Sequence, residues 1–185
     1  MHHLFKLLTG GDLLRAPIRD STPRVLDIGT GTGEWALEMA EDYPQANIIG
    51  TDLSPIQPNW APPNCRFFID DAESDWTFSP HEKFDYVHAR SMGGGIGDWP
   101  KLLKQIYQHL KPGGWFEAQE FEALVLSDDG THERATSILG WQDLLNQAST
   151  KFGKPMNVAP RLTEWMVNQG FANVTDDIYK VRTSI

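Results

Sequence analysis

A strand, a glycine-rich loop and a helix follow one another within residues 25–43, and this unit constrains the fold more than any other part of the sequence. Val25–Ile28 is a short apolar run typical of a buried strand. Gly29, Gly31 and Gly33 come next, and apolar residues then recur at the spacing of one helical face. Glycines let the backbone turn sharply and approach a ligand without a Cβ clash. The unit therefore predicts the first crossover of an α/β sheet, with a ligand over its loop.

The rest of the chain continues this alternation of strand-like and helix-like segments. Further strands are expected at Ile48–Thr51, Arg66–Ile69, Phe84–His88 and Trp115–Gln119, with a weaker last one at Val174–Val181. Helices are expected at Trp99–Leu110, at about Glu133–Phe152 and from Pro160 to Gly170. Four prolines within Ser54–Asn64 predict a loop in place of a crossover helix. The pattern predicts a Rossmann-like, doubly wound, mostly parallel sheet in a single domain, residues 1–185.

Charge and composition argue against several classes of function. The chain has 16 basic and 25 acidic residues, a net charge of −9, and this negative field opposes binding to nucleic acid or to anionic lipid. No apolar run approaches the roughly 20 residues that span a bilayer. Cys65 is the single cysteine, and there is no HExxH motif, so neither an internal disulfide nor a metal site is predicted. A cytoplasmic location is expected, and a nuclear one is compatible with the sequence.

Acidic residues at the ends of predicted strands indicate which nucleotide the loop would hold. Asp52 ends the second strand, 19 positions after Gly33, and its two oxygens suit vicinal ribose hydroxyls. Asp27 ends the first strand, where it would repel a pyrophosphate but attract a sulfonium or an ammonium group. Asp70 and Asp71 close the third strand, where an adenine amino group could find an acceptor. This acidic set favours S-adenosyl-L-methionine over NAD, although Asp27 could instead cap the glycine loop.

The successive motifs resemble those of class I S-adenosylmethionine-dependent methyltransferases: VLDIGTGTG, GTDLS, DDAE and LKPGGWFE. More narrowly, the chain resembles the fungal LaeA-like methyltransferases of secondary metabolism in HHLF, RVLDIGTGTGEWA, GTDLSPIQPNW, APPN, DDAESDW and LKPGGWFEAQEFE. The resemblance implies the class I fold and methyl transfer to a small-molecule acceptor. It also allows a regulatory protein that binds the cofactor without turnover and has a protein partner. Such methyltransferases usually end with two further strands, one antiparallel, and the chain offers a single candidate, so the antiparallel strand is expected to be lacking.

The resemblance also implies contacts to the methionine part of the cofactor. Gly29, Gly31 and Gly33 would wrap this part, and Asp27 would hold its ammonium group directly or through water. Arg90, after the fourth strand, would close over the same end. A surface ion pair is the alternative role for Arg90.

Four further residues would hold the nucleoside part of the cofactor, as the resemblance implies. Asp52 would bind the ribose hydroxyls, and Leu53 would pack on the adenine face. Asp71 would accept a hydrogen bond from the adenine amino group, and the backbone of Ala72 would contact the ring edge.

The sequence selects no catalytic residue. Methyl transfer is an in-line displacement that needs mainly proximity and alignment, and a general base is required only if the acceptor must lose a proton. Ionisable residues expected near the acceptor are His88, Glu117, Glu120 and His132. A hydrogen-bonded core position is the alternative for His88, and an exposed carboxylate is the alternative for Glu120.

Glycines and tryptophans mark other positions of interest. Gly93–Gly97 is unusually glycine-rich at the expected rim of the acceptor site. Trp60 and Trp76 lie in predicted loops, where they could line a pocket or simply pack. Trp141 lies on the apolar face of its predicted helix and is expected in the core.

Overall fold

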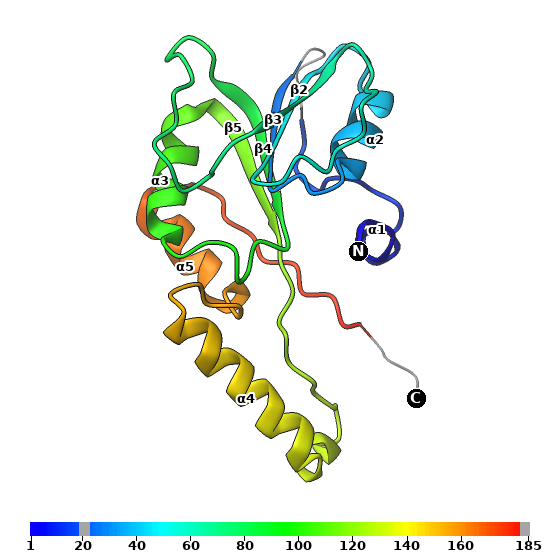
Figure 1. Ribbon diagram of the computed structural model, residues 1–185, viewed down its shortest axis with the longest axis vertical. Coiled ribbons are helices and arrows are strands. Elements are labelled where there is room, and N and C mark those ends of the chain that lie inside the picture. Colours follow the sequence, from blue (N-terminus) through cyan, green and yellow to red (C-terminus); the bar gives the residue numbers. More distant parts are fainter. Residues whose placement is uncertain (19–22, 182–185) are drawn as a thin grey trace.

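Five parallel strands form one sheet, in the order β3–β2–β1–β4–β5, in the computed structural model (Figure 1). The structure describes residues 1–18 and 23–181. The strands are β1 (Arg24–Ile28), β2 (Asn47–Asp52), β3 (Cys65–Ile69), β4 (Phe84–Arg90) and β5 (Leu110–Gln119). Because every neighbouring pair is parallel, all five carboxyl ends meet at one edge of the sheet. The predicted α/β fold is confirmed, and the described residues contain no antiparallel strand.

Helices cover both faces of the sheet. They are α1 (His2–Leu8), α2 (Glu34–Asp42), α3 (Trp99–His109), α4 (Thr136–Lys151) and α5 (Ala159–Gln169), with a 3₁₀ turn, η1 (Thr131–Arg134). α2 packs on one face and α3 and α5 on the other, whereas α4 lies away from the sheet, beside the segment that follows β5 (Figure 1). Within residues 1–18 and 23–181, no helix combines the length and the apolar character needed to cross a bilayer.

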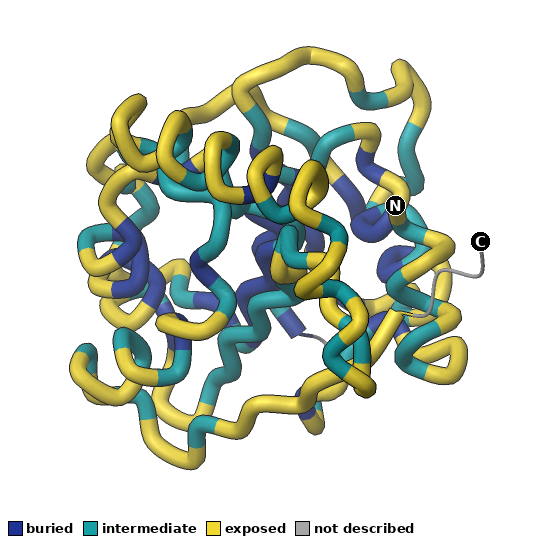
Figure 2. Tube along the Cα trace, turned by 90° about the horizontal axis from the view of Figure 1, so that it is seen from below, coloured by how far each residue is buried: buried dark blue, intermediate teal, exposed yellow. Residues whose placement is uncertain are grey.

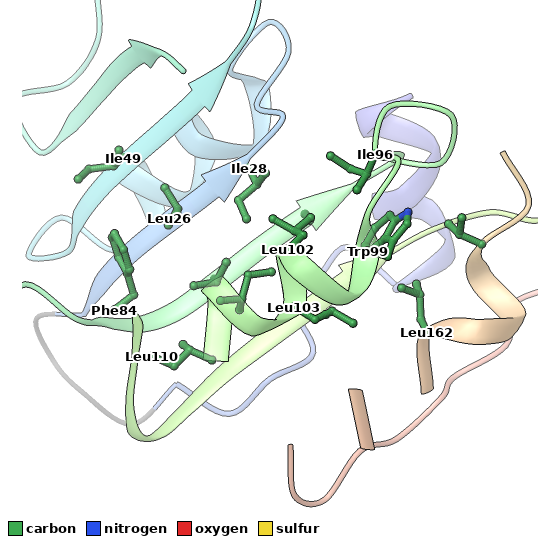
Figure 3. Close-up of a cluster of buried hydrophobic side chains, with 14 residues drawn as sticks. Leu26, Ile28, Ile49, Phe84, Ile96, Trp99, Leu102, Leu103, Leu110 and Leu162 are labelled. Atoms are coloured by element: carbon green, nitrogen blue, oxygen red, sulfur yellow. The ribbon is translucent and has the colours of Figure 1, made fainter. Parts of the chain in front are cut away.

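The core has one cluster of side chains on each face of the sheet. Alternate residues of a strand point to opposite faces, so Val25 of β1 contributes to the cluster under α2, with Trp35. Leu26 points the other way, toward Leu102 and Leu103 of α3 (Figure 3). Full burial of each such side chain stabilises the fold by roughly 1.5–3 kcal/mol. A central strand buried on both faces explains why Val25, Leu26 and Ile28 of β1 are all apolar.

α3 begins and ends at the signals in its sequence. The side chain of Asp98 accepts a hydrogen bond from the backbone N–H of Lys101 at 2.9 Å, and Pro100 occupies the first turn. The helix ends at His109, one residue earlier than predicted. β5 then begins directly at Leu110, which pairs with Phe84, so this strand is longer at its start than the sequence predicts.

Two predictions for the C-terminal part are wrong. Val174–Val181 is irregular rather than a strand, because no described strand pairs with it. Most of its side chains are accordingly exposed, and Ile178 is 83% exposed. α4 begins after η1, and Trp141 on it is 61% exposed, while Gln142 is buried and accepts a hydrogen bond from the backbone of Val125. Figure 2, a view from below, shows mostly exposed positions along α4. The apolar positions of α4 belong to neither core cluster of the described residues.

The proline-rich segment after β2 has no helix, as predicted. Residues 53–64 run from β2 to β3 as turns and irregular backbone. Trp60 in this segment is 74% exposed, whereas Trp76, after β3, packs against the core.

Candidate functional site

The glycine loop lies at the carboxyl edge of the sheet, between β1 and α2. Gly29, Gly31 and Gly33 have φ values of +66°, +59° and +81°, a region that favours glycine. A Cβ on Gly31 would meet no atom within 4 Å, so this part of the loop faces open space. The sharp turn predicted for the loop is confirmed.

The other two glycines make room for protein side chains. A Cβ on Gly29 would overlap the Sδ atom of Met92, which follows β4. A Cβ on Gly33 would lie 2.6 Å from the ring of Phe67, on β3. Of these three loop glycines, Gly31 is therefore the one with free space beside it. Nothing in the sequence indicated that Met92 and Phe67 contact these glycines, because both residues lie far from the loop along the chain.

Asp27 is 2% exposed, and both of its oxygens accept hydrogen bonds. Its Oδ1 lies 2.7 Å from Nδ1 of His88, the residue beside it on β4, and its Oδ2 accepts from the hydroxyl of Thr30 at 2.6 Å. The hydrogen bond from Thr30 ties Asp27 to the glycine loop. This corresponds to the alternative that Asp27 caps the loop. Burial of Asp27 restricts direct contact with a ligand and leaves its negative charge close beneath the loop.

Asp52 links the end of β2 to the glycine loop. Its Oδ2 accepts from the backbone N–H of Gly31 at 2.8 Å, and its Oδ1 accepts from that of Ser54 at 2.9 Å. A carboxylate has about four lone-pair positions, so two stay available for a ligand. Leu53, next in the chain, is 65% exposed. Gln57, which the sequence did not suggest, donates to the carbonyl of Gly31 at 2.7 Å.

Asp71 and Ala72 follow β3 at the same edge of the sheet. Asp71 is exposed, and its Oδ1 accepts from the backbone N–H of Glu73 at 2.9 Å. Ala72 packs against the core, and its carbonyl accepts from the indole N–H of Trp76 at 3.1 Å. Asp71 therefore has the exposure that a ligand contact requires, and Trp76 has a packing role.

Arg90 ends β4 and contacts α1. Its Nη2 lies 3.1 Å from Nδ1 of His2, and its guanidinium carbon lies 5.4 Å from the centroid of the Phe5 ring. Burial lowers the pKa of Arg90 below its usual value, although the nearby carboxylate of Asp27 acts in the opposite direction. Among the described residues, Arg90 forms no salt bridge with a carboxylate, and its role stays a prediction.

All four residues considered as a general base are hydrogen-bonded within the protein: His88, Glu117, Glu120 and His132. Glu117 accepts from the hydroxyl of Tyr86 at 2.9 Å. The two oxygens of Glu120 accept from the backbone N–H groups of Met92 and Gly93 at 2.6 and 3.1 Å. Burial raises the pKa of Glu120 to about 7, against the opposing effect of these two hydrogen bonds.

Close backbone packing explains the glycine-rich segment Gly93–Gly97. A Cβ on Gly93 would overlap the carbonyl oxygen of Met156, and one on Gly97 would lie 2.8 Å from that of Gly153. Glu73 ties these loops together, because one of its oxygens accepts from the N–H of Gly97 at 2.8 Å and the other pairs with Lys154 at 2.7 Å. The segment is held against the start of the α4–α5 connection.

An open cleft of about 1830 Å³ follows the outer edge of β5. Its walls come from α1, from β5 with the residues that follow it, and from α5 with the segment after it. Many lining side chains are apolar, among them Leu4, Phe5, Phe116, Leu126 and Met166. Glu120 also lines this cleft, which therefore reaches the carboxyl edge of the sheet.

Comparison with known proteins relates the chain to methyltransferases. A family model described as "Methyltransferase domain" matches residues 2–176. The chain is 42% identical over 182 residues to "Methyltransferase pytC" of Aspergillus terreus, covering 98% of this chain and 56% of that protein. It is 35% identical to "Secondary metabolism regulator LAE1" of Cochliobolus heterostrophus, covering 97% of this chain and 60% of that protein. The chain thus spans a little over half the length of these curated relatives.

A solved structure shows the same fold. Phosphoethanolamine N-methyltransferase 2 of Haemonchus contortus, in complex with phosphomonomethylethanolamine and S-adenosylhomocysteine, superposes with a TM-score of 0.59 at 23% identity. The match covers 92% of this chain and 36% of that one. At this identity the likeness concerns the fold.

Proposed function

The chain belongs to the methyltransferase domain family, and from this we propose that it binds S-adenosylmethionine and transfers the methyl group to a small-molecule acceptor. The observation that carries the proposal is the set of acidic residues at neighbouring strand ends. Asp27 lies near the end of β1, Asp52 ends β2 and Asp71 follows β3, so all three stand at the carboxyl edge of the sheet, and Asp52 accepts from the backbone N–H of Gly31. A phosphate-rich ligand would be repelled there, whereas a cationic one would be attracted.

The nucleoside part fits the end of β2 and β3. The free lone pairs of Asp52 would accept from the two ribose hydroxyls, in a geometry that the bonds from Gly31 and Ser54 hold fixed. Leu53 would lie against the adenine ring, and Asp71 would accept from its amino group. The exposure of both side chains supports this assignment.

The methionine part would lie over Gly31, between opposite charges. Asp27 would attract the ammonium group from beneath the loop, through water or through its remaining lone pairs. Arg90 would attract the carboxylate from the end of β4. The cofactor supplies a methyl group on a positively charged sulfur, and the protein has to align that methyl with the acceptor and to exclude water.

The acceptor would enter through the cleft beside β5, and its apolar lining favours a largely apolar small molecule. Relatives named as a methyltransferase and as a regulator of secondary metabolism support an acceptor from that metabolism. No base is assigned, because each of the four residues considered already has a hydrogen-bond partner in the protein. We also propose a cytoplasmic location, with the nucleus as the alternative.

Calorimetric titration with S-adenosylhomocysteine and with NAD tests the proposal. We expect heat of binding from S-adenosylhomocysteine and none from NAD. Asp52→Asn should weaken the affinity by about ten- to a hundredfold, because a charge-assisted hydrogen bond contributes about 1.5–3 kcal/mol. Asp143→Asn, the same charge change on α4, should leave the affinity unchanged. Binding of NAD alone would instead support an oxidoreductase, and a protein that binds neither ligand would refute the proposal.

A non-catalytic regulatory protein is the second candidate. The observation that favours it is that His88, Glu117, Glu120 and His132 each already have a hydrogen-bond partner within the protein. It predicts S-adenosylmethionine binding without formation of S-adenosylhomocysteine from any metabolite tested, and a protein partner in its place. Measured turnover with one metabolite would eliminate this candidate.

A further inference from the structure

We propose that His88 is a positioning residue, which fixes the carboxylate of Asp27 so that its charge acts on the ammonium group of the cofactor. The inference rests on the proposed function, because it places the methionine part of S-adenosylmethionine over the glycine loop. His88 itself would not touch the cofactor, since it is completely buried.

Strand register brings the two residues together. Asp27 and His88 are partners on the parallel strands β1 and β4, as are Val25 and Tyr86 two positions earlier. Both side chains therefore point to the face of the sheet that α2 covers. Oδ1 of Asp27 lies 2.7 Å from Nδ1 of His88, which leaves Oδ2 to accept from Thr30. The carboxylate is thus held from two sides, by the sheet and by the loop.

Trp35 of α2 fixes the orientation of the His88 ring. The two rings are stacked, with centroids 3.9 Å apart and an angle of 9° between their planes. Trp35 is itself 1% exposed, and its indole N–H donates to the carbonyl of Leu13 at 2.9 Å. With the ring pinned in this way, Nδ1 stays directed at Asp27.

The hydrogen-bond pattern of His88 leaves Nδ1 as the ring nitrogen that serves Asp27. Nε2 of His88 is buried and has no partner among the described residues. A doubly protonated ring would bury an N–H group there without an acceptor, and such orphaned donors are rare in proteins. The neutral ring with its proton on Nδ1 satisfies its single donor. In this arrangement His88 donates to one oxygen of Asp27, while Thr30 of the loop donates to the other.

Two substitutions separate the hydrogen bond from the packing. His88→Phe keeps an aromatic ring against Trp35 but removes the donor. His88→Asn loses the stacking but places an amide N–H close to the position of Nδ1. The probes are S-adenosylhomocysteine, which has the ammonium group, and 5′-methylthioadenosine, which has the same nucleoside but no amino-acid part. Both are titrated by calorimetry, and the melting temperature of each variant is recorded.

We expect His88→Phe to weaken S-adenosylhomocysteine binding about tenfold and to leave 5′-methylthioadenosine binding unchanged. His88→Asn should retain most of the affinity for S-adenosylhomocysteine even where it lowers the melting temperature. Adding Asp27→Asn to His88→Phe should bring no loss beyond that of Asp27→Asn alone, because His88 acts through Asp27.

Other results overturn the inference. If His88→Phe weakens both ligands equally, or neither, His88 has only a packing role. If His88→Phe does not fold, Thr30→Val decides, since it removes the second bond to Asp27 and should produce the same ligand-selective loss. A wild-type protein that binds S-adenosylhomocysteine while these variants bind it equally well refutes the inference and leaves the proposed function intact. A wild-type protein that binds neither ligand refutes both.

Discussion

Gly31 and Gly33 both have positive φ, but only Gly33 also makes room for a side chain, so alanine at each position should have different effects. The left-handed backbone costs a non-glycine residue about 1–2 kcal/mol. Gly33→Ala would in addition press on Phe67, and overpacking typically costs about 1–3 kcal/mol more. Urea unfolding should therefore show the larger loss of stability for Gly33→Ala.

Gly31→Ala should act mainly on the ligand, because its Cβ would enter the open space over the loop. We expect weaker binding of S-adenosylhomocysteine than for the wild type. The combination of Gly33→Ala with Phe67→Leu should recover part of the stability lost in Gly33→Ala. Equal destabilisation by the two alanines, or unchanged affinity in Gly31→Ala, would contradict this division of roles.

Glu120 should make stability depend on pH between about 4.5, its usual pKa, and about 7, its raised value in the fold. In this interval the folded state binds more protons than the unfolded state, so the free energy of unfolding falls as pH rises. The contribution of Glu120 to the free energy of unfolding should fall by about 2 kcal/mol over this interval. Glu120→Gln cannot titrate at this position and should lack this contribution. Urea unfolding of both proteins from pH 4.5 to 8 measures the difference.

The neighbouring exposed Glu122 provides the control for this pH dependence. Glu122→Gln should follow the wild-type curve across the same interval. A Glu120→Gln protein whose stability runs parallel to that of the wild type at every pH would show that Glu120 ionises normally in the fold.

The sequence predicted which acidic residues stand at the strand ends, but not what surrounds them. Asp27 and Asp52 follow apolar runs, and parallel strands bring such ends to one edge. Contacts such as Gln57 with Gly31 depend on how a proline-rich loop folds back, which local pattern does not encode. The binding roles of the predicted site residues stay predictions that the experiments above test.

Among the elements, the connections after β3, after β4 and between α4 and α5 meet at Glu73. Burial raises the pKa of Glu73, but Lys154 and the backbone N–H groups of Asp98 and Gly97 lower it by more, so the pKa lies below its usual value. The stabilisation that the ionised Glu73 gives the fold is therefore complete above about pH 4.5. It is lost as pH falls through the lowered pKa of Glu73. Glu73→Gln should cost about 1 kcal/mol at pH 7 and progressively less in acid.

A double-mutant cycle with Lys154→Ala checks this contact. The two substitutions together should cost less than the sum of their separate effects. Lys180→Ala is the matched control, because its ion pair with Asp128 is exposed and such pairs contribute little. Additive effects of Glu73→Gln and Lys154→Ala would show that the 2.7 Å ion pair contributes nothing measurable.

Elements of the sheet were predictable because burial on both faces leaves a clear pattern. β1 and β2 are apolar on both sides, and α3 has an apolar face with a capping residue and a terminating Pro-Gly segment. Val174–Val181 also contains β-branched and aromatic residues, but a strand forms only where a neighbour supplies hydrogen bonds. The apolar positions of α4 have the period of a buried helix, and periodicity alone does not specify an opposing surface.

For the molecule as a whole, the net charge of −9 should distinguish the cofactor from its product. S-adenosylmethionine carries a sulfonium, an ammonium and a carboxylate, a net charge of +1, whereas S-adenosylhomocysteine has no net charge. The negative field of the protein, to which Asp27 and Asp52 contribute, should attract the first more strongly at low salt. Salt screens this attraction, since the Debye length falls from about 10 Å at 0.1 M to about 3 Å at 1 M.

We therefore expect the affinity for S-adenosylmethionine to fall several-fold between 0.02 and 0.5 M NaCl, roughly the range over which surface charges become screened. The affinity for S-adenosylhomocysteine should change much less, and calorimetric titration of both ligands in the same buffers measures the difference. Asp52→Asn should lower both affinities but keep most of the difference in salt dependence, because the field comes from the whole acidic set. If both ligands respond equally to salt, the charge of the protein plays no part in selecting the cofactor, and selection would then depend on hydrogen bonds and shape alone.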